Sequence, residues 1–348
     1  MKMMNSIDEI IKVIQKNNSF LITSHVNLDG DAIGSELALY FILKKLNKKS
    51  VILNQDKLPR IYNFLPDNNK VYHLENNFSD IKNIDVGIVL DCSNIKRIGK
   101  TYEIFKDIRT VINIDHHESN EKYGSLNYVD CSASSVGEII YDLIKFINID
   151  LLDEDIAACL FTAILTDTGS FRYSNSSSKT FEIASRLTSC GIKPHLIANN
   201  VYNRNTFPGL KLLGKALLNL EINESNHVSW LSITRKMLDD TKAKDEEIEG
   251  IIDVATTLNN VEISALFRET KDNKIKVSFR SKGNFDVNKF AGKFNGGGHP
   301  NAAGCVCSGK LDEIKENILS ELFNDIKHIG YKNKDKYYTD RKDDCNIK

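Results

Sequence analysis

Four clusters of acidic residues and histidines follow apolar runs in this chain, and the first of them is the most informative. Residues 20–24 read Phe-Leu-Ile-Thr-Ser, which predicts a buried strand, and His25, Asp29 and Asp31 come directly after it. Apolar runs of this kind end at the edge of an open α/β sheet, where crevices form. Two carboxylates crowded at such an edge repel each other unless a positive charge lies between them. The pattern therefore favours an α/β fold with a charged site at one edge of its sheet.

The other three clusters repeat this arrangement: Asp91 follows residues 86–90, Asp115-His116-His117 follows residues 111–114, and Asp167 follows residues 156–166. A single aspartate after an apolar run is more often a turn former or a helix N-cap. Four such sites in one chain are harder to explain by local turn chemistry. Carboxylate oxygens combined with imidazole nitrogens suit a divalent cation such as Mn²⁺.

Length and charge narrow the class of protein. A chain of 348 residues is long enough for two domains that each bury a core. No apolar run reaches the length needed to cross a bilayer, and residues 1–6 lack the apolar core of a signal peptide, so we expect a cytoplasmic protein that does not bind membranes. The net charge of −1 argues against a protein that grips long duplex nucleic acid, although a local basic patch stays open.

The first half of the chain alternates between strand and helix patterns. Strands are expected within residues 20–24, 50–53, 86–90 and 111–114, and helices over 7–16, 30–46, 136–147, 154–166 and 180–190. Alternation of this kind predicts a parallel sheet with helices on both faces. We expect this α/β domain to span residues 1–205.

The pattern changes after residue 205. A helix over 210–220, within a connecting segment 206–224, precedes strands at 228–233, 261–268 and 274–280, with helices near 246–257, 287–294 and 311–326. Lys271-Asp272-Asn273 predicts a hairpin turn between the last two strands. This predicts a smaller α+β domain over residues 225–330, followed by a polar, flexible tail over 331–348. The seven cysteines are scattered, and Cys305-Val306-Cys307 is assigned to strand packing.

The charged residues of the first domain are the kinds that a two-metal site requires. Such a site needs carboxylates that can bridge two ions and neutral imidazoles that complete the coordination. The available residues are Asp29, Asp31, Asp91, Asp167, His25 and His116. Gly30 is expected to allow a sharp turn between two of these aspartates, and the helix that begins after it would direct its N-terminus at the same crevice.

These four motifs, in this order, resemble those of the DHH phosphoesterases, and the resemblance extends over nearly all of residues 1–330. It implies two divalent metal ions, most readily Mn²⁺. One ion would be held by His25, Asp29 and Asp91, and the other by Asp31, Asp91, His116 and Asp167, with Asp91 as the bridge. His117 would contact the scissile phosphate, Asp115 would orient its neighbours, and Arg97 would either reach a phosphate or be a surface arginine.

The second domain carries the run Asn295-Gly296-Gly297-Gly298-His299-Pro300. Successive glycines can form a nest of backbone N–H groups that binds anions, and the guanidinium groups of Arg268 and Arg280 suit phosphate. A glycine run on its own is more often a flexible loop. The segment resembles the DHHA1 domain, which implies that the nucleotide is held by Arg268, Arg280, Ser281, Gly297, Gly298 and His299.

Several activities share this architecture. The compact length resembles the bacterial nano-RNases of the family, which implies hydrolysis of short oligoribonucleotides to mononucleotides and removal of the 3′-phosphate of adenosine 3′,5′-bisphosphate. The alternative is a phosphodiesterase for cyclic di-AMP or its linear product pApA. A nucleotide-sensing module without turnover also stays open. RecJ-like exonucleases are usually longer, and family II pyrophosphatases lack the glycine–histidine motif. The family often forms dimers, so a homodimer is among the expectations.

Overall fold

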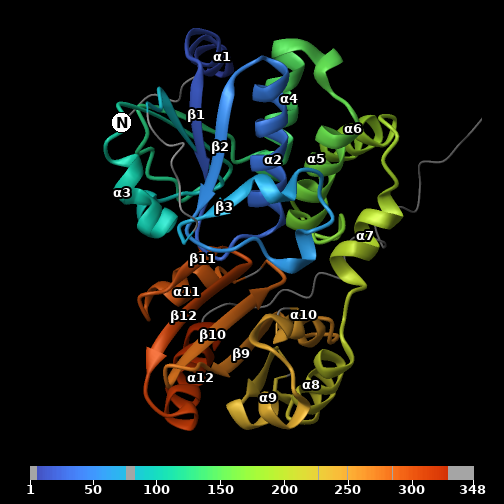
Figure 1. Cartoon of the computed structure of the whole chain (residues 1–348). Coiled ribbons are helices and arrows are strands. Elements are labelled where there is room, and N and C mark those ends of the chain that lie inside the picture. Colours follow the sequence, from blue (N-terminus) through green and yellow to red (C-terminus); the bar gives the residue numbers. More distant parts are fainter. Residues whose placement is uncertain (1–5, 76–82, 226, 249, 284, 328–348) are drawn as a thin grey trace, which may run out of the picture. The chain divides into compact units, whose positions relative to one another are not determined.

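The computed structural model of the chain describes residues 6–75, 83–225, 227–248, 250–283 and 285–327 (Figure 1). The chain divides into two compact units, unit 1 at Met1–Arg204 and unit 2 at Asn205–Lys348. The tail expected over 331–348, and the last residues of the domain expected over 225–330, lie outside the described residues. None of the helices in the described ranges combines the length and the apolar character that crossing a membrane requires.

Unit 1 is built on a six-stranded sheet in the order β3-β2-β1-β4-β5-β6. All five pairings are parallel, and the strands are β1 (Ser19–Thr23), β2 (Lys49–Asn54), β3 (Val71–His73), β4 (Val86–Leu90), β5 (Thr110–Asp115) and β6 (Leu126–Val129). The four strands expected from apolar runs are confirmed. The two edge strands were missed because they are short and carry polar residues. Since β1 lies between β2 and β4, the strand order reverses there, and a crevice is expected at the carboxyl ends of β1 and β4.

Helices cover both faces of this sheet. The helices of unit 1 are α1 (Ile7–Lys16), α2 (Gly30–Lys45), α3 (Tyr102–Phe105), α4 (Val136–Asn148), α5 (Glu154–Asp167), α6 (Ser178–Thr188) and α7 (Pro194–Tyr202). Figure 1 shows α2, α4 and α5 on one side of the sheet and α3 on the other. Side chains of β1 alternate accordingly, because Phe20 and Ile22 join the core under α2, whereas Leu21 packs with Phe105 on the opposite face.

Close packing of α2 against α5 depends on two glycines. A Cβ atom at Gly30 would lie 2.3 Å from Thr166 Oγ1, and one at Gly34 would lie 2.5 Å from the carbonyl oxygen of Cys159. Gly30 is the first residue of α2 and is not among the residues with positive φ. Its expected role in a sharp turn is therefore wrong, and its absent side chain instead lets two buried helices approach.

Unit 2 contains a second six-stranded sheet in the order β11-β12-β10-β9-β8-β7. Its strands are β7 (Glu221–Ile222), β8 (Val228–Ile233), β9 (Ile263–Glu269), β10 (Lys274–Ser281), β11 (Gly297–His299) and β12 (Ala302–Ser308). Only the β8–β9 pair is parallel. The predicted hairpin joins β9 to β10 through a turn in which Asn273 has a φ of 56°. The expected α+β class is confirmed.

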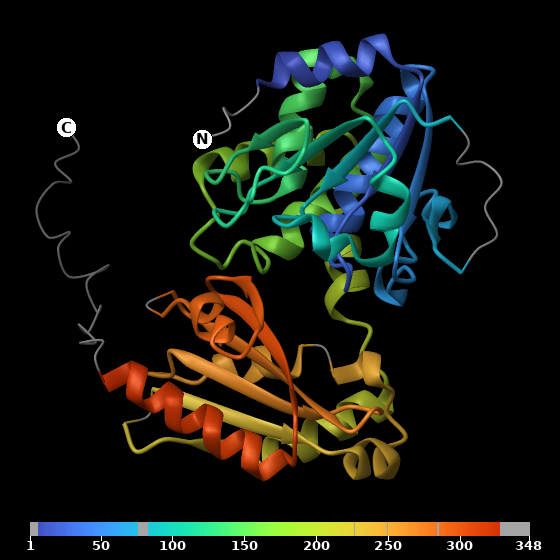
Figure 2. The ribbon, with the colours of Figure 1, turned by 90° about the vertical axis from the view of Figure 1, so that its left-hand side faces the viewer.

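Helices lie on both faces of the second sheet as well. They are α8 (Phe207–Leu218), α9 (Arg235–Thr241), α10 (Ile251–Thr256), α11 (Val287–Gly292) and α12 (Leu311–Lys327), and Figure 2 shows α12 along one face. Leu212 and Ala216 of α8 are fully buried in a cluster with Leu231 of β8, so most of the segment expected as a connector packs inside unit 2. Cys305 packs in the other core cluster, as the strand assignment implies.

Candidate metal centre and substrate face

The charged site of unit 1 begins where β1 ends. His25 follows this strand and is buried, and its Nδ1 lies 2.8 Å from the carbonyl oxygen of Val26. Its Nε2 lies 3.5 Å from Asp29 Oδ2 and 3.3 Å from Asp91 Oδ2. Asp29 is also the N-cap of α2, because its Oδ1 accepts a hydrogen bond of 3.0 Å from the backbone of Ala32. Asp29 therefore has one carboxylate oxygen used for structure and one directed at the site.

Asp91 lies at the centre of the site. It follows β4 in a left-handed conformation with φ of 51°, and its backbone N–H donates to the carbonyl oxygen of Ile114 on β5. Oδ2 faces His25, whereas Oδ1 lies 3.7 Å from His116 Nε2 and 3.5 Å from His117 Nδ1. Asp91 Oδ1 is buried, and no hydrogen-bond donor reaches it within the described part of the chain. A buried carboxylate oxygen without a donor is costly, which fits a position opposite a cation.

His116 connects Asp91 to two further carboxylates. Its Nε2 lies 3.9 Å from Asp31 Oδ2 and 3.6 Å from Asp167 Oδ2, and its Nδ1 lies 3.3 Å from the carbonyl oxygen of Ala133. Two sets of potential ligand atoms thus share Asp91, one with His25 and Asp29 and one with Asp31 and His116, and within each set all atoms lie within 4.8 Å of one another.

Both carboxylate oxygens of Asp31 accept hydrogen bonds that fix its orientation. Its Oδ1 accepts hydrogen bonds from Ser35 Oγ at 3.0 Å and from the backbone of Gly137 at 2.9 Å, and its Oδ2 accepts from the backbone of Val136 at 2.7 Å. The last two donors belong to the first turn of α4, where backbone N–H groups and the helix dipole favour an anion. A carboxylate of α2 therefore caps α4 and remains oriented towards His116.

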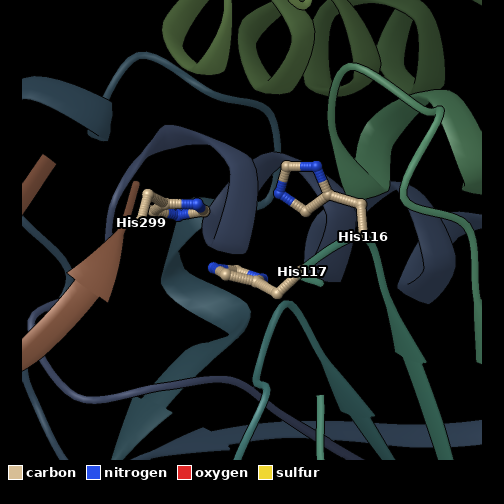
Figure 3. Close-up of side chains that lie close together, drawn as sticks. All are labelled: His116, His117 and His299. Atoms are coloured by element: carbon tan, nitrogen blue, oxygen red, sulfur yellow. The ribbon is translucent and has the colours of Figure 1, made fainter. Parts of the chain in front are cut away.

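His117 and Asp115 form a fixed pair beside this centre. His117 Nδ1 lies 2.6 Å from Asp115 Oδ1, which also accepts from the backbone of His116, and Asn120 donates to Asp115 Oδ2 at 2.5 Å. Burial would raise the pKa of Asp115, but attraction to His117 and these hydrogen bonds outweigh it and lower the pKa to about 2. The rings of His116 and His117 meet edge to face after β5, with centroids 4.9 Å apart (Figure 3).

The carboxylates of the site repel one another, so an added positive charge would stabilise their ionised forms. Burial is the largest of the causes that raise the pKa of Asp167 to about 7. Attraction to His116 lowers this pKa, and repulsion from Asp91 raises it further. Burial together with Asp91 and Asp167 raises the pKa of Asp31 well above its usual value. Asp167 is also the last residue of α5, where the negative end of a helix dipole opposes a carboxylate. Burial lowers the pKa of His116, yet Asp167, Asp91 and Asp31 raise it to about 10. The carboxylate and imidazole donors fit divalent metal ions.

Arg97 lies beside the centre, in the 3₁₀ segment Ile95–Thr101. Its carbonyl oxygen accepts a 2.8 Å hydrogen bond from the backbone of Val26, the residue after His25, and its side chain is half-buried. The structure therefore brings Arg97 to the loop that carries the first cluster. Asn120, which donates to Asp115, was missed by the sequence analysis because an asparagine in a polar loop reads as an ordinary turn residue.

The arginines of unit 2 share one face of the second sheet, but they lie far apart along it. In the antiparallel β9–β10 pair, Arg268 lies opposite Lys276 and Arg280 lies opposite Ser264. Four residues separate the two rows, or about 13 Å along the strands. Arg280 Nε donates to Asp253 Oδ1 at 2.9 Å, and an Nη of Arg268 donates weakly to the carbonyl oxygen of Asp245 at 3.5 Å.

The register assigns His299 to the row of Arg280. His299 pairs with Ala302 on β12, and Ala302 pairs with Arg280 on β10. The adjacent row on this face consists of Gly297, Gly304 and Ser278 and continues to the buried Leu266 on β9, so small residues form the part of the row on β11, β12 and β10. Ser281 is one residue beyond Arg280 and so belongs to the opposite face, where its Oγ accepts from the backbone of Gly283.

Two glycines of the run, Gly297 and Gly298, lie in strand β11. The backbone N–H of Gly296 donates to the carbonyl oxygen of Ala291, and that of Gly298 donates to Asn288 Oδ1 at 2.9 Å. These two N–H groups are therefore used within unit 2 and do not contribute to an anion-binding nest. Gly298 has a φ of 152°, and a Cβ atom there would lie 2.4 Å from the carbonyl oxygen of Ala302. The glycines therefore allow β11 to pair closely with β12.

Comparisons with known proteins agree with the division of the chain into two units. Residues 19–164 match the DHH family N-terminal domain, and residues 228–326 match the DHHA1 domain. The chain is 30% identical to a Thermus thermophilus protein named bifunctional oligoribonuclease and PAP phosphatase NrnA, over 94% of this chain and 96% of that one. A Bacillus subtilis protein of the same name is 29% identical over 90% and 96%.

A solved structure shares the whole fold. The crystal structure of an exopolyphosphatase-related protein from Bacteroides fragilis superimposes with a TM-score of 0.87 at 30% identity, and covers 92% of this chain and 97% of that one. With both domain models matched in order and relatives similar over nearly their full length, the chain belongs to the DHH/DHHA1 family of phosphoesterases.

Proposed function

We propose that this protein hydrolyses short oligoribonucleotides to mononucleotides and also removes the 3′-phosphate of adenosine 3′,5′-bisphosphate. The observation that carries the proposal is the position of Asp91, whose two carboxylate oxygens face two separate groups of potential ligand atoms. The names of the Thermus thermophilus and Bacillus subtilis relatives support this choice of substrates. Both reactions break a phosphate ester beside a ribose 3′-oxygen, so one site can serve both.

We assign two divalent cations, with Mn²⁺ as the preferred ion. His25, Asp29 and Asp91 would hold one, and Asp31, Asp91, His116 and Asp167 would hold the other. When bound, such ions supply a water nucleophile at neutral pH and neutralise the charge of the phosphoryl group. The donor set supports this assignment, because buried carboxylates whose pKa values are raised by burial and by mutual repulsion gain most from a cation.

His117 is assigned to the scissile phosphate. Its Nδ1 is committed to Asp115 at 2.6 Å, which fixes the orientation of the ring and leaves Nε2 as the nitrogen that can serve the substrate. An imidazole held in this way presents its ring in one fixed orientation to a phosphate oxygen. Arg97, beside the loop of His25, is assigned to a neighbouring phosphate.

Unit 2 is assigned to nucleotide recognition. The face that carries Arg268, Arg280 and His299 combines positive charge with a floor of small residues, and a flat nucleotide fits such a surface. Gly297 belongs to this floor, and Gly298 lies beside it in β11. Ser281 is retained as a weaker candidate because its hydroxyl group is engaged with Gly283.

The cytoplasm is the proposed compartment. RNA fragments and adenosine 3′,5′-bisphosphate arise there, and the described cysteines, Cys92, Cys131, Cys159, Cys190, Cys305 and Cys307, are all free thiols, as expected of a reducing environment.

A substrate panel tests the proposed activity. The full chain with Mn²⁺ is given a diribonucleotide, a five-nucleotide RNA, adenosine 3′,5′-bisphosphate, pApA, cyclic di-AMP and pyrophosphate, and kcat/KM is compared across them. We expect the diribonucleotide and the bisphosphate to rank highest. If cyclic di-AMP or pyrophosphate had the highest kcat/KM, the proposed substrates would be contradicted. Binding of these compounds without turnover of any of them would indicate a sensing module.

A further inference from the structure

Strand β2 supplies none of the proposed metal ligands, yet its carboxyl end contacts the loop that carries two of them. Asn54, the last residue of β2, and Asp56, two residues later, each hydrogen-bond to the segment that leaves β1. The two strands are parallel neighbours, so their carboxyl ends lie at the same edge of the sheet. Both side chains are therefore in contact with the segment that carries His25 and Asp29.

Asn54 is fully buried and holds the residues just before His25. Its Oδ1 accepts a 3.1 Å hydrogen bond from Thr23 Oγ1 and a 3.0 Å hydrogen bond from the backbone of Ser24. Its Nδ2 donates to Glu36 Oε2 on α2 at 2.9 Å. The amide orientation is thereby determined at both ends, which fixes where β1 stops and where His25 starts.

The same contact extends to the loop of Asp91. Ser24 Oγ donates to the carbonyl oxygen of Leu90 at 2.8 Å, and Leu90 directly precedes Asp91. Asn54, Ser24 and Leu90 therefore form a buried chain of polar contacts across β2, β1 and β4. This chain sets the spacing between the backbone of His25 and the backbone of Asp91.

Asp56 holds the other half of the loop. Its Oδ2 accepts a 2.6 Å hydrogen bond from the backbone of Asn27, which lies midway between His25 and Asp29. Asn27 is left-handed, with φ of 61°, a conformation that needs such local support. Removing the acceptor would let this residue relax and would change how the side chains of His25 and Asp29 converge.

The other group of ligands has different supports. Asp31 is held by Ser35 and by the first turn of α4, and His116 is held through the carbonyl oxygen of Ala133. Neither support involves β2. Asp91 belongs to both groups, but Asp56 contacts the loop between His25 and Asp29. A change at Asp56 should therefore act mainly on the group that contains His25 and Asp29.

We propose that Asn54 and Asp56 are positioning residues that orient His25 and Asp29, so that the end of β2 determines the affinity of one of the two metal ions. The inference rests on the proposed function, because it assumes that those residues are ligands. Partners that orient metal ligands typically change metal affinity by about 10–100-fold when they are replaced.

The test is a calorimetric titration of the chelated full-length protein with Mn²⁺. In Asp56→Ala we expect one of two binding steps to weaken by about tenfold or more, and the other to stay within about threefold. Asp56→Asn keeps a carbonyl acceptor for Asn27 and should stay close to the wild type. Asp85→Ala is the matched control, because Asp85 also accepts backbone N–H groups, from Asn18 and Ser19 at 3.0 Å, but at the opposite edge of the sheet.

Asn54→Ala should weaken the same step. Its control is Asn127→Ala, since Asn127 is equally buried and hydrogen-bonds within its own loop to Gly124, away from the proposed ligands. Unchanged affinities in Asp56→Ala, equal weakening of both steps, or an Asp56→Asn variant as weak as Asp56→Ala would overturn the positioning role. Fewer than two steps in the wild-type protein would instead contradict the proposed metal centre itself.

Discussion

Most of the candidate residues of unit 1 are buried and bonded to one another, whereas the candidate arginines and the histidine of unit 2 are half-exposed. Asp91, Asp115 and His117 are almost fully buried in unit 1. In unit 2, by contrast, Arg280 is half-exposed and bonded to Asp253, a surface contact that costs little to break. The difference indicates that unit 1 is preorganised for chemistry, while unit 2 can adapt to a ligand.

Loss of Asp91 should produce the largest effect. In Asp91→Ala one carboxylate that faces both groups of ligands is removed, so Mn²⁺ binding and turnover should be lost together. Turnover assays, Mn²⁺ titration and circular dichroism on the same preparation measure this. A folded variant that still turns over at the wild-type rate would break the account of unit 1.

Asp115→Asn should lower kcat by roughly 10²- to 10³-fold. This is the loss expected when an enzyme loses one oriented hydrogen-bond donor that stabilises the charge of the transition state. The reason is that His117 would lose the carboxylate that fixes the orientation of its ring, at 2.6 Å from Nδ1. Mn²⁺ affinity should change much less than kcat. A variant that loses metal but keeps kcat at saturating Mn²⁺ would instead make Asp115 part of the metal centre.

Arg268→Ala and His299→Ala should raise KM by about 10–100-fold, which corresponds to one charged hydrogen bond, and should leave kcat nearly unchanged. Lys310→Ala is a suitable control, because Lys310 is exposed and its ammonium group forms a weak ion pair with the nearby Glu313. A selective fall in kcat with normal KM would erase the contrast between the two units.

The smallest effects concern stability and should have opposite signs in the two units. Gly34→Ala should cost about 1–3 kcal/mol of unfolding free energy, because the new methyl group meets α5. Gly214 lies in the exposed part of α8, where no atom of the described residues comes within 4 Å of an added Cβ. Gly214→Ala should therefore stabilise the protein by about 0.5–1 kcal/mol. Denaturant unfolding measures both, and a tolerated Gly34→Ala would show that α2 and α5 can separate.

The sequence pattern predicted much of unit 1 because its strands are buried on both faces and read as continuous apolar runs. Asp91 and His116 follow such runs in parallel strands, so their meeting at one edge was predictable. Asn54 was not, because a buried asparagine at a strand end looks like an ordinary turn residue. Its role depends on which strand lies beside β2, and a single apolar run carries no such information.

In unit 2 the sequence was less informative because antiparallel pairing reverses the strand direction. Arg268 and Arg280 both lie near the ends of predicted strands, yet these ends point in opposite directions, so the side chains are separated along the sheet. The glycines before His299 looked like a loop or a nest. Pairing of Gly297 with Gly304 and of Gly298 with Ala303 makes these two glycines part of a strand instead, and tertiary packing determines that outcome.

The most direct test of the central claim is a crystal structure of the full chain grown with Mn²⁺, with anomalous diffraction measured at the manganese edge. We predict two anomalous peaks in unit 1, one among His25, Asp29 and Asp91 and one among Asp31, Asp91, His116 and Asp167. Well-ordered crystals without peaks at these side chains, or with peaks only elsewhere, would contradict the claim.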